Sequence, residues 1–217
     1  MRSFHIITDY YEEDTHIFTK NKVSFKAGLT VLVGCNGSGK TTLLKQIKLQ
    51  CEKKEIPYVY YNNLTSGHSN SANRHILNGD VEFVARYALS SEGENIISNI
   101  GEICGKIGRT IRYKTDEKKE MFVLLDAIDS GLSVDNIIEI KRDMFQFITK
   151  DAKESNGIDI YFIAAANEYE LARNERCLQI NTLEYVDIPD YETYRNIIIQ
   201  TRKEKNNRYG WEEFKGK

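Results

Sequence analysis

Residues 34–41 read GCNGSGKT and lie where an apolar run, Val31 to Val33, meets an amphipathic run. They fit the pattern G-x-x-x-x-G-K-[ST], whose glycines let the chain fold back so that successive N–H groups point at one anion. The following helix would add its positive N-terminal end. We expect Lys40 to reach the β- and γ-phosphates of a nucleotide, and Thr41 to offer its hydroxyl to Mg²⁺. The nucleotide-binding residues expected here are Gly34, Asn36, Gly37, Ser38, Gly39, Lys40, Thr41 and Thr42.

A phosphate-binding loop of this kind needs an acidic group at the end of a neighbouring buried strand. The run MFVLLD, residues 121–126, has five apolar residues followed by Asp126. A carboxylate in that place can hold Mg²⁺ directly or through a water molecule. The sequence therefore predicts that Thr41 and Asp126 are the protein groups at a magnesium site.

The rest of the chain alternates apolar runs, which are typical of buried strands, with amphipathic runs, which are typical of helices. Strands are expected at 4–11, 16–25, 29–33, 56–63, 121–125 and 158–166, and a strand or hairpin at 177–188. Helices are expected at 40–54, 81–89, 94–109, 133–154 and 190–208. The pattern predicts an α/β domain with a mainly parallel sheet flanked by helices. The first strands have no helix between them and should form an antiparallel N-terminal β subdomain.

Composition narrows the class of protein. The chain has 217 residues and a formal net charge of −2, so its overall charge does not indicate a nucleic-acid or membrane partner. No apolar run approaches the roughly 20 residues that span a bilayer, and we expect a cytoplasmic protein without a membrane segment. The four cysteines are scattered without a C-x-x-C pair, and we interpret them as reduced structural thiols.

Three further segments resemble motifs of a known family. SSEGE at 90–94 lies between the two motifs above, DSGLS at 129–133 follows Asp126, and an apolar run ends in AAAN at 164–167. In this order they resemble the soluble branch of the ABC-type ATPases, that is, the SMC and RecF-type DNA-repair ATPases and short phage and bacterial relatives. The resemblance implies a P-loop NTPase fold of ABC-ATPase type, with ATP and Mg²⁺ as cofactors. It implies one domain over residues 1–205, with a helical signature segment at about 74–112 and a flexible tail at 206–217.

The resemblance also implies how two molecules meet. In the family, the signature segment of one subunit covers the γ-phosphate bound by the other, and here that role falls on Ser91 and Gly93. The segment 129–133 resembles the loop that touches the partner subunit. We therefore expect an ATP-dependent homodimer, with DNA or a second protein as a further partner, serving a DNA-related, phage or defence process.

Two positions depart from the family pattern. Ala127 stands where the family has the glutamate that activates water, and Asn167 stands where it has a histidine that contacts the γ-phosphate. Near the family's glutamine loop the chain offers Asn62 and Asn63. Losing a positioned general base costs about 10²- to 10⁴-fold in rate. Two explanations of Ala127 stay open: a naturally slow ATPase that uses ATP as a dimerisation switch, or a protein whose glutamate was replaced to trap the ATP-bound form. Asp129 and Glu168 are weaker candidates for the missing base.

Two other functions remain open. A P-loop nucleotide kinase would need a mobile lid, for which Arg109 and Arg112 are candidates. A non-hydrolysing ATP-binding interaction module would bind ATP without turnover. The residue that stacks on adenine is open as well, since the aromatic candidates could instead be buried in the core. The aromatic candidates are Tyr10, Tyr11 and Phe18.

Overall fold

The structure is a computed structural model that describes residues 1–8, 16–62, 92–114 and 119–208, with only the backbone described for 92–99 and 114. The strands are β1 (Arg2–His5), β2 (Lys22–Phe25), β3 (Gly28–Val33), β4 (Tyr58–Asn62), β5 (Glu120–Asp126), β6 (Asp159–Ala165), β7 (Cys177–Gln179) and β8 (Glu184–Val186). The helices are α1 (Lys40–Lys53), α5 (Glu92–Lys114), α6 (Val134–Glu139), the π-helix η1 (Ile140–Gln146), α7 (Phe147–Asn156), α8 (Tyr169–Ala172) and α9 (Tyr191–Arg208).

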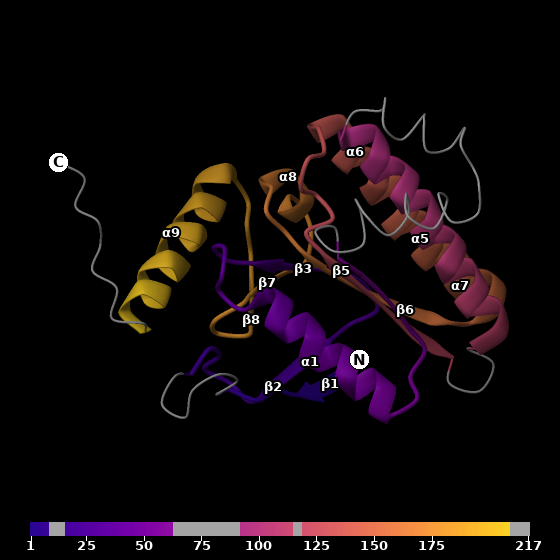
Figure 1. Cartoon of the computed structure of the whole chain (residues 1–217), viewed down its shortest axis with the longest axis horizontal. Helices are drawn as coiled ribbons and strands as arrows, with labels where there is room; N and C mark the ends of the chain where they lie inside the picture. Colours follow the sequence, from indigo (N-terminus) through magenta and orange to yellow (C-terminus); the bar gives the residue numbers. More distant parts are fainter. Residues whose placement is uncertain (9–15, 63–91, 115–118, 209–217) are drawn as a thin grey trace, which may run out of the picture.

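The main sheet has six strands in the order β4-β5-β6-β3-β7-β8, and all pairs are parallel except β7 with β8. The strands β1 and β2 form a separate antiparallel pair. The predicted α/β class and the antiparallel N-terminal subdomain are therefore confirmed. Figure 1 shows the main sheet between α1 and the layer of α5, α6 and α7.

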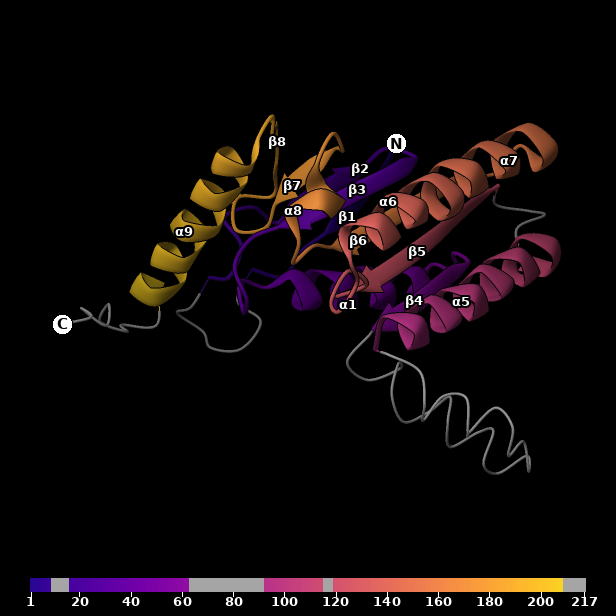
Figure 2. The same ribbon diagram turned by 90° about the horizontal axis from the view of Figure 1, so that it is seen from above.

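Both faces of the main sheet are covered, and its central strands β3, β5 and β6 are accordingly apolar along most of their length. Successive side chains point to opposite faces. In β3, Val31 and Val33 join the core beneath α5, α7 and α9, whereas Leu32 joins the core beneath α1 and the β1–β2 pair. All three are fully buried. Figure 2 shows this layering from a second direction.

Several expected boundaries shift. The strands expected at 4–11 and 16–25 are too long, since β1 ends at His5 and β2 begins at Lys22. The helix expected at 133–154 forms, but a π-helix occupies 140–146. The short helix α8 was not expected, because four residues are too few to show a helical period. The helix expected at 81–89 lies outside the described residues, and α9 reaches Arg208, three residues into the expected tail.

The parallel strands place their carboxyl ends at one edge of the sheet, where ligands bind in open α/β sheets. β3 ends at the phosphate loop, β5 at Asp126, and β6 two residues before Asn167. β4 ends at Asn62, which pairs in register with Asp126. The phosphate loop, Asp126 and Asn167 are thus brought to one edge. Among the described residues, no helix is both long and apolar enough to cross a membrane.

Candidate functional site

A pocket of about 600 Å³ lies at this edge. Of the residues expected to bind the nucleotide, six line it: Asn36, Gly37, Gly39, Lys40, Thr41 and Thr42. Asp126, Ala127 and Asn167 line it as well. Gly34 and Ser38 do not; Gly34 faces a second cavity, and Ser38 is buried within the loop. Ser91 lies outside the described residues, and Gly93 is in the first turn of α5.

The loop can wrap around an anion because of the glycine at its end. Gly39 has φ 109° and precedes α1 as its N-cap, a conformation that side-chain-bearing residues rarely adopt. A Cβ atom there would lie 2.6 Å from the Ile17 side chain. The first turn of α1 has no acidic residue, and no side chain caps it with a hydrogen bond within the described residues. Its free N–H groups therefore remain available to a phosphate.

Lys40 is held in the loop by main-chain carbonyls. Its Nζ donates to the Gly34 carbonyl at 2.6 Å and to the Cys35 carbonyl at 3.3 Å. Burial lowers the pKa of the Lys40 ammonium, while nearby acidic groups, among them Asp129 and Asp126, oppose the shift. A buried cation with only neutral acceptors gains when an anion arrives. Lys40 therefore fits the expected role at the phosphates.

The magnesium donors lie on neighbouring elements. Asp126 is buried at the end of β5, and its Oδ2 accepts a hydrogen bond from Asn62 Nδ2 at 2.8 Å. Thr41 and Asp126 both line the pocket. The described residues contain no cluster of three His, Cys, Asp or Glu side chains. One hydroxyl and one carboxylate suit Mg²⁺, which takes its other ligands from phosphates and water.

The position of the family's glutamate is occupied by a residue without acid–base chemistry. Ala127 lines the pocket and is 8% exposed, with φ 55°. Asp129, a weaker candidate for that base, does not line the pocket. Its carboxylate accepts N–H groups of Asn167 and Glu168, at 2.7 and 2.8 Å. Burial raises the pKa of Asp129 although these hydrogen bonds oppose the shift. Glu168 lies outside the pocket, in the second cavity.

Asn167 is held from several sides. Its Nδ2 donates to Ser130 Oγ at 2.8 Å, and its carbonyl accepts the Tyr194 hydroxyl at 3.0 Å. Its main-chain N–H is bound to Asp129, as above. The segment that follows Asp126 therefore fixes the residue at the expected γ-phosphate position. An amide so placed can hold a water molecule or a phosphate oxygen, but it cannot accept a proton as a histidine would.

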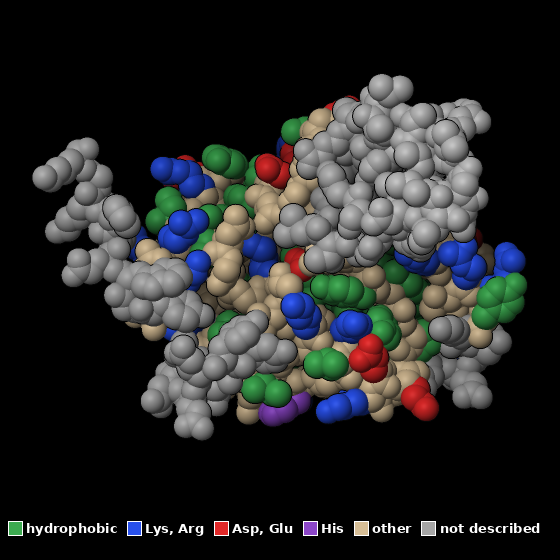
Figure 3. Space-filling view, in the orientation of Figure 1, with side chains coloured by type: hydrophobic (Ala, Val, Ile, Leu, Met, Phe, Trp, Pro, Cys, Tyr) green, Lys and Arg blue, Asp and Glu red, His purple; other side chains and the backbone are tan. Residues whose placement is uncertain are grey.

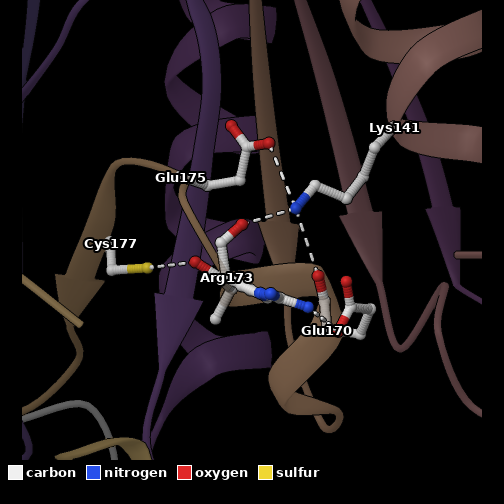
Figure 4. Close-up of polar contacts among 6 residues, drawn as sticks. Lys141, Glu170, Arg173, Glu175 and Cys177 are labelled. Carbon is white, nitrogen blue, oxygen red and sulfur yellow. Dashed lines mark hydrogen bonds and ion pairs between the residues drawn. The ribbon is translucent and has the colours of Figure 1, made fainter. Parts of the chain in front are cut away.

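The helix after Asn167 is anchored at its other end by Lys141. Lys141 Nζ donates to the carbonyls of Arg173 at 2.6 Å and Glu170 at 3.1 Å, and it forms an ion pair with Glu175 at 3.2 Å. Figure 4 shows Lys141 pointing to the C-terminal end of α8. A cation is favoured there by the free carbonyls of the last turn. Sequence reasoning missed this contact, because nothing in the sequence near Lys141 indicates a partner about thirty residues away.

Other candidates from the sequence do not reach the pocket. Arg109 and Arg112 are exposed on α5 and do not line it. Phe18 is a buried core residue, and Ile17 lines the pocket in its place. Tyr10 and Tyr11 lie outside the described residues. The hydrophobic residue Ile17 was missed because a single apolar side chain in a short strand-like run has no sequence signal of ligand contact.

Comparison with known proteins agrees with this geometry. A family model described as AAA domain matches residues 13–208. No curated protein matches the chain significantly. A solved structure of a DNA replication initiation factor is similar at 14% identity and a TM-score of 0.30, covering 87% of this chain and 47% of that chain. The chain thus spans about half the length of that protein, and so low a score is no evidence of shared function. Because the family model covers most of the sequence, the chain belongs to the AAA domain family and contains an ATP-binding domain of the P-loop ATPase type.

Proposed function

We propose that the protein binds ATP with Mg²⁺ in the pocket at the carboxyl edge, and that two copies associate head to tail around the bound nucleotides. The observation that supports this most directly is the lining of one pocket by Lys40, Thr41, Asp126 and Asn167. These side chains come from three different strand ends and match the parts that a triphosphate and its metal require. A purely structural role in turns at the ends of the strands would not explain why these side chains meet in one cavity.

Dimerisation is proposed from the position of the signature-like segment. The helix α5 begins at Glu92, next to Ser91 and within the run SSEGE. Because α5 leads directly into β5 of a parallel sheet, its N-terminal end lies toward the carboxyl edge (Figure 1). A segment at this edge can reach a nucleotide held by a second copy. Its glycine and the N–H groups of a helix start suit close approach to a phosphate.

Hydrolysis is proposed to be slow, since Asp126, which is assigned to the magnesium ion, is the one carboxylate among the described residues that line the pocket. Ala127 supplies none, and the Asp129 carboxylate is engaged by two main-chain N–H groups. The same observation favours a second candidate function, an ATP-binding interaction module without turnover. Both would use ATP binding as a switch for assembly, in a DNA-related, phage or defence process.

The test combines ATP-dependent assembly of two copies with restored ATP hydrolysis. We expect gel filtration with saturating ATP and Mg²⁺ to give a dimer that Ser91→Arg abolishes. Ala127→Glu should raise ATP turnover by about 10²-fold or more, because the side chain would enter the pocket from a backbone that already holds a non-glycine residue at positive φ. Turnover unchanged by this substitution would support the non-hydrolysing module. A monomer under saturating ATP would contradict the dimer. Hydrolysis measured with and without DNA tests the DNA-related setting.

A further inference from the structure

The C-terminal helix α9 contacts both walls of the nucleotide pocket. Its Thr201 Oγ1 accepts the Cys35 N–H of the phosphate loop at 2.9 Å, and its Lys205 Nζ donates to the Asn36 carbonyl at 3.2 Å. Two turns earlier, the Tyr194 hydroxyl donates to the Asn167 carbonyl. These contacts join residues more than 25 positions apart. One face of α9 thus contacts the loop under the phosphates and the loop opposite them.

The contact at Thr201 is buried. Thr201 is 2% exposed and Cys35 is also 2% exposed. The Thr201 hydroxyl also donates to the Ile198 carbonyl of its own helix at 3.0 Å, so its proton is used there and its lone pairs face Cys35. The Cys35 N–H therefore depends on the Thr201 hydroxyl as its acceptor. Without the hydroxyl it would be a buried donor that lacks an acceptor, which is a costly condition.

The space between α9 and the phosphate loop is otherwise only partly filled. A second cavity of about 410 Å³ lies there, lined by Cys35 and Asn36 on one side and by Tyr194, Ile198 and Arg202 on the other. Figure 3 shows Lys and Arg side chains gathered over the part of the surface where α9 lies. Because close packing is incomplete beside this cavity, the hydrogen bonds of Thr201 and Lys205 are important for holding the loop to the helix.

We propose that Thr201 is a positioning residue of the phosphate loop, through which α9 sets the affinity of the loop for ATP; this rests on the proposed binding of ATP at that loop. The reason is that the loop can adopt more conformations without ATP than with ATP bound. Without the Thr201 acceptor, the free loop can turn the Cys35 N–H toward water. Binding requires the loop to return to the conformation that surrounds the phosphates. Burying the unpaired N–H on binding then makes the free energy of ATP binding less favourable.

Lys205 supports the loop at the next residues. A Cβ atom added to Gly37 would lie 2.7 Å from Lys205 Nζ, so the ammonium lies directly against the outer face of the loop. Lys205 itself is not among the residues that line the pocket. We expect this contact to contribute less than that of Thr201, because it is partly exposed.

The experiment measures ATP affinity and thermal stability for the full chain and its variants, with a fluorescent ATP analogue and Mg²⁺. Thr201→Val keeps the shape and removes the acceptor, and we expect the dissociation constant to rise about tenfold. Thr201→Ser keeps the hydroxyl and should stay within about twofold of the unmodified protein. Ile197→Val is the matched control, because Ile197 is a buried residue of α9 that lines neither pocket. It should lower the melting temperature without changing the dissociation constant.

Each outcome decides the matter. An unmodified protein that binds no ATP would refute the proposed function itself. Binding by the unmodified protein with an equal dissociation constant for Thr201→Val would refute the positioning role alone, as would an equal loss of affinity in Ile197→Val. If Thr201→Val does not fold, Lys205→Met gives the second reading. It should raise the dissociation constant about threefold, and an unchanged value would count against α9 as the controlling element.

Discussion

Replacing Gly39 by alanine is expected to disturb both stability and nucleotide binding, for two reasons that can be separated. Gly39 has φ 109°, and its Cβ would lie 2.6 Å from Ile17 Cγ2 and 3.2 Å from Phe18 Cε1. Carbon atoms in contact are normally about 3.5–4.0 Å apart. The disfavoured backbone costs about 1–3 kcal/mol, and the overlap costs about 1–3 kcal/mol more. We therefore expect a loss of about 2–6 kcal/mol in the free energy of unfolding.

The chain provides matched controls for this change. Gly157 also has positive φ, at 68°, but no atom lies within 4 Å of its Cβ position, so Gly157→Ala should suffer only the backbone strain. Gly101 lies inside α5 in open space, and Gly101→Ala should stabilise the helix by about 0.5–1 kcal/mol. Each kcal/mol shifts the melting temperature by about 2–4 °C in a protein of this size. Thermal unfolding followed by circular dichroism should therefore rank Gly101→Ala above Gly157→Ala, and Gly157→Ala above Gly39→Ala.

ATP titration of the same variants shows whether a substitution alters the nucleotide pocket or only the stability of the protein. Gly39→Ala should weaken ATP binding, because the added methyl group displaces the loop or the Ile17 side chain that lines the pocket. Gly157→Ala and Gly101→Ala lie away from the pocket and should bind ATP as the unmodified protein does. If Gly39→Ala were as stable as Gly157→Ala, the overlap with Ile17 and Phe18 would be wrong, and with it the packing assigned to the phosphate loop.

Two further predictions concern Lys141, which is half-buried, and two buried cysteines. Lys141→Met should lower ATP affinity and speed hydrogen exchange at Asn167, because Lys141 anchors α8, the helix that follows Asn167. Lys153→Met, which removes an exposed ion pair with Asp159, is the control and should change neither ATP affinity nor hydrogen exchange. Burial raises the pKa values of Cys51 and Cys177 to about 12. Their protonated forms are thus favoured by folding, so the stability they contribute is present below pH 9 and is lost as the pH rises toward 12. Alkylation at pH 8 should leave both thiols unmodified until the protein unfolds, and rapid labelling of the folded protein would contradict their burial.

Much of the nucleotide site follows from local sequence. The run from Gly34 to Thr41 needs glycines, a lysine and a hydroxyl in fixed order, and each acts through the backbone next to it. The same holds for Asp126, which ends an apolar strand. Parallel strands then bring such ends to one edge, so the meeting of Lys40 and Asp126 follows from the predicted parallel sheet, whereas Asn167 was singled out through the family resemblance.

The supports of the site could not be predicted in this way. Thr201, Lys205 and Tyr194 look like ordinary residues of an amphipathic helix, and Lys141 looks like a solvated charge. Their roles depend on partners that lie far away along the chain, and a hydrogen bond between distant residues has no period or spacing in the sequence. Boundaries were missed for a related reason, since the extent of β1 and β2 depends on how the two segments pair and not only on where β-branched residues occur.

Local chemistry therefore determined what this protein can bind, because the atoms that surround a phosphate come from eight consecutive residues. Only the tertiary structure decided what holds those atoms in place, since α9 packs against the loop from the far end of the chain. It also decided that Asp129 is engaged by main-chain N–H groups instead of facing the nucleotide, because the direction of a side chain follows from the packing of the elements on either side of it.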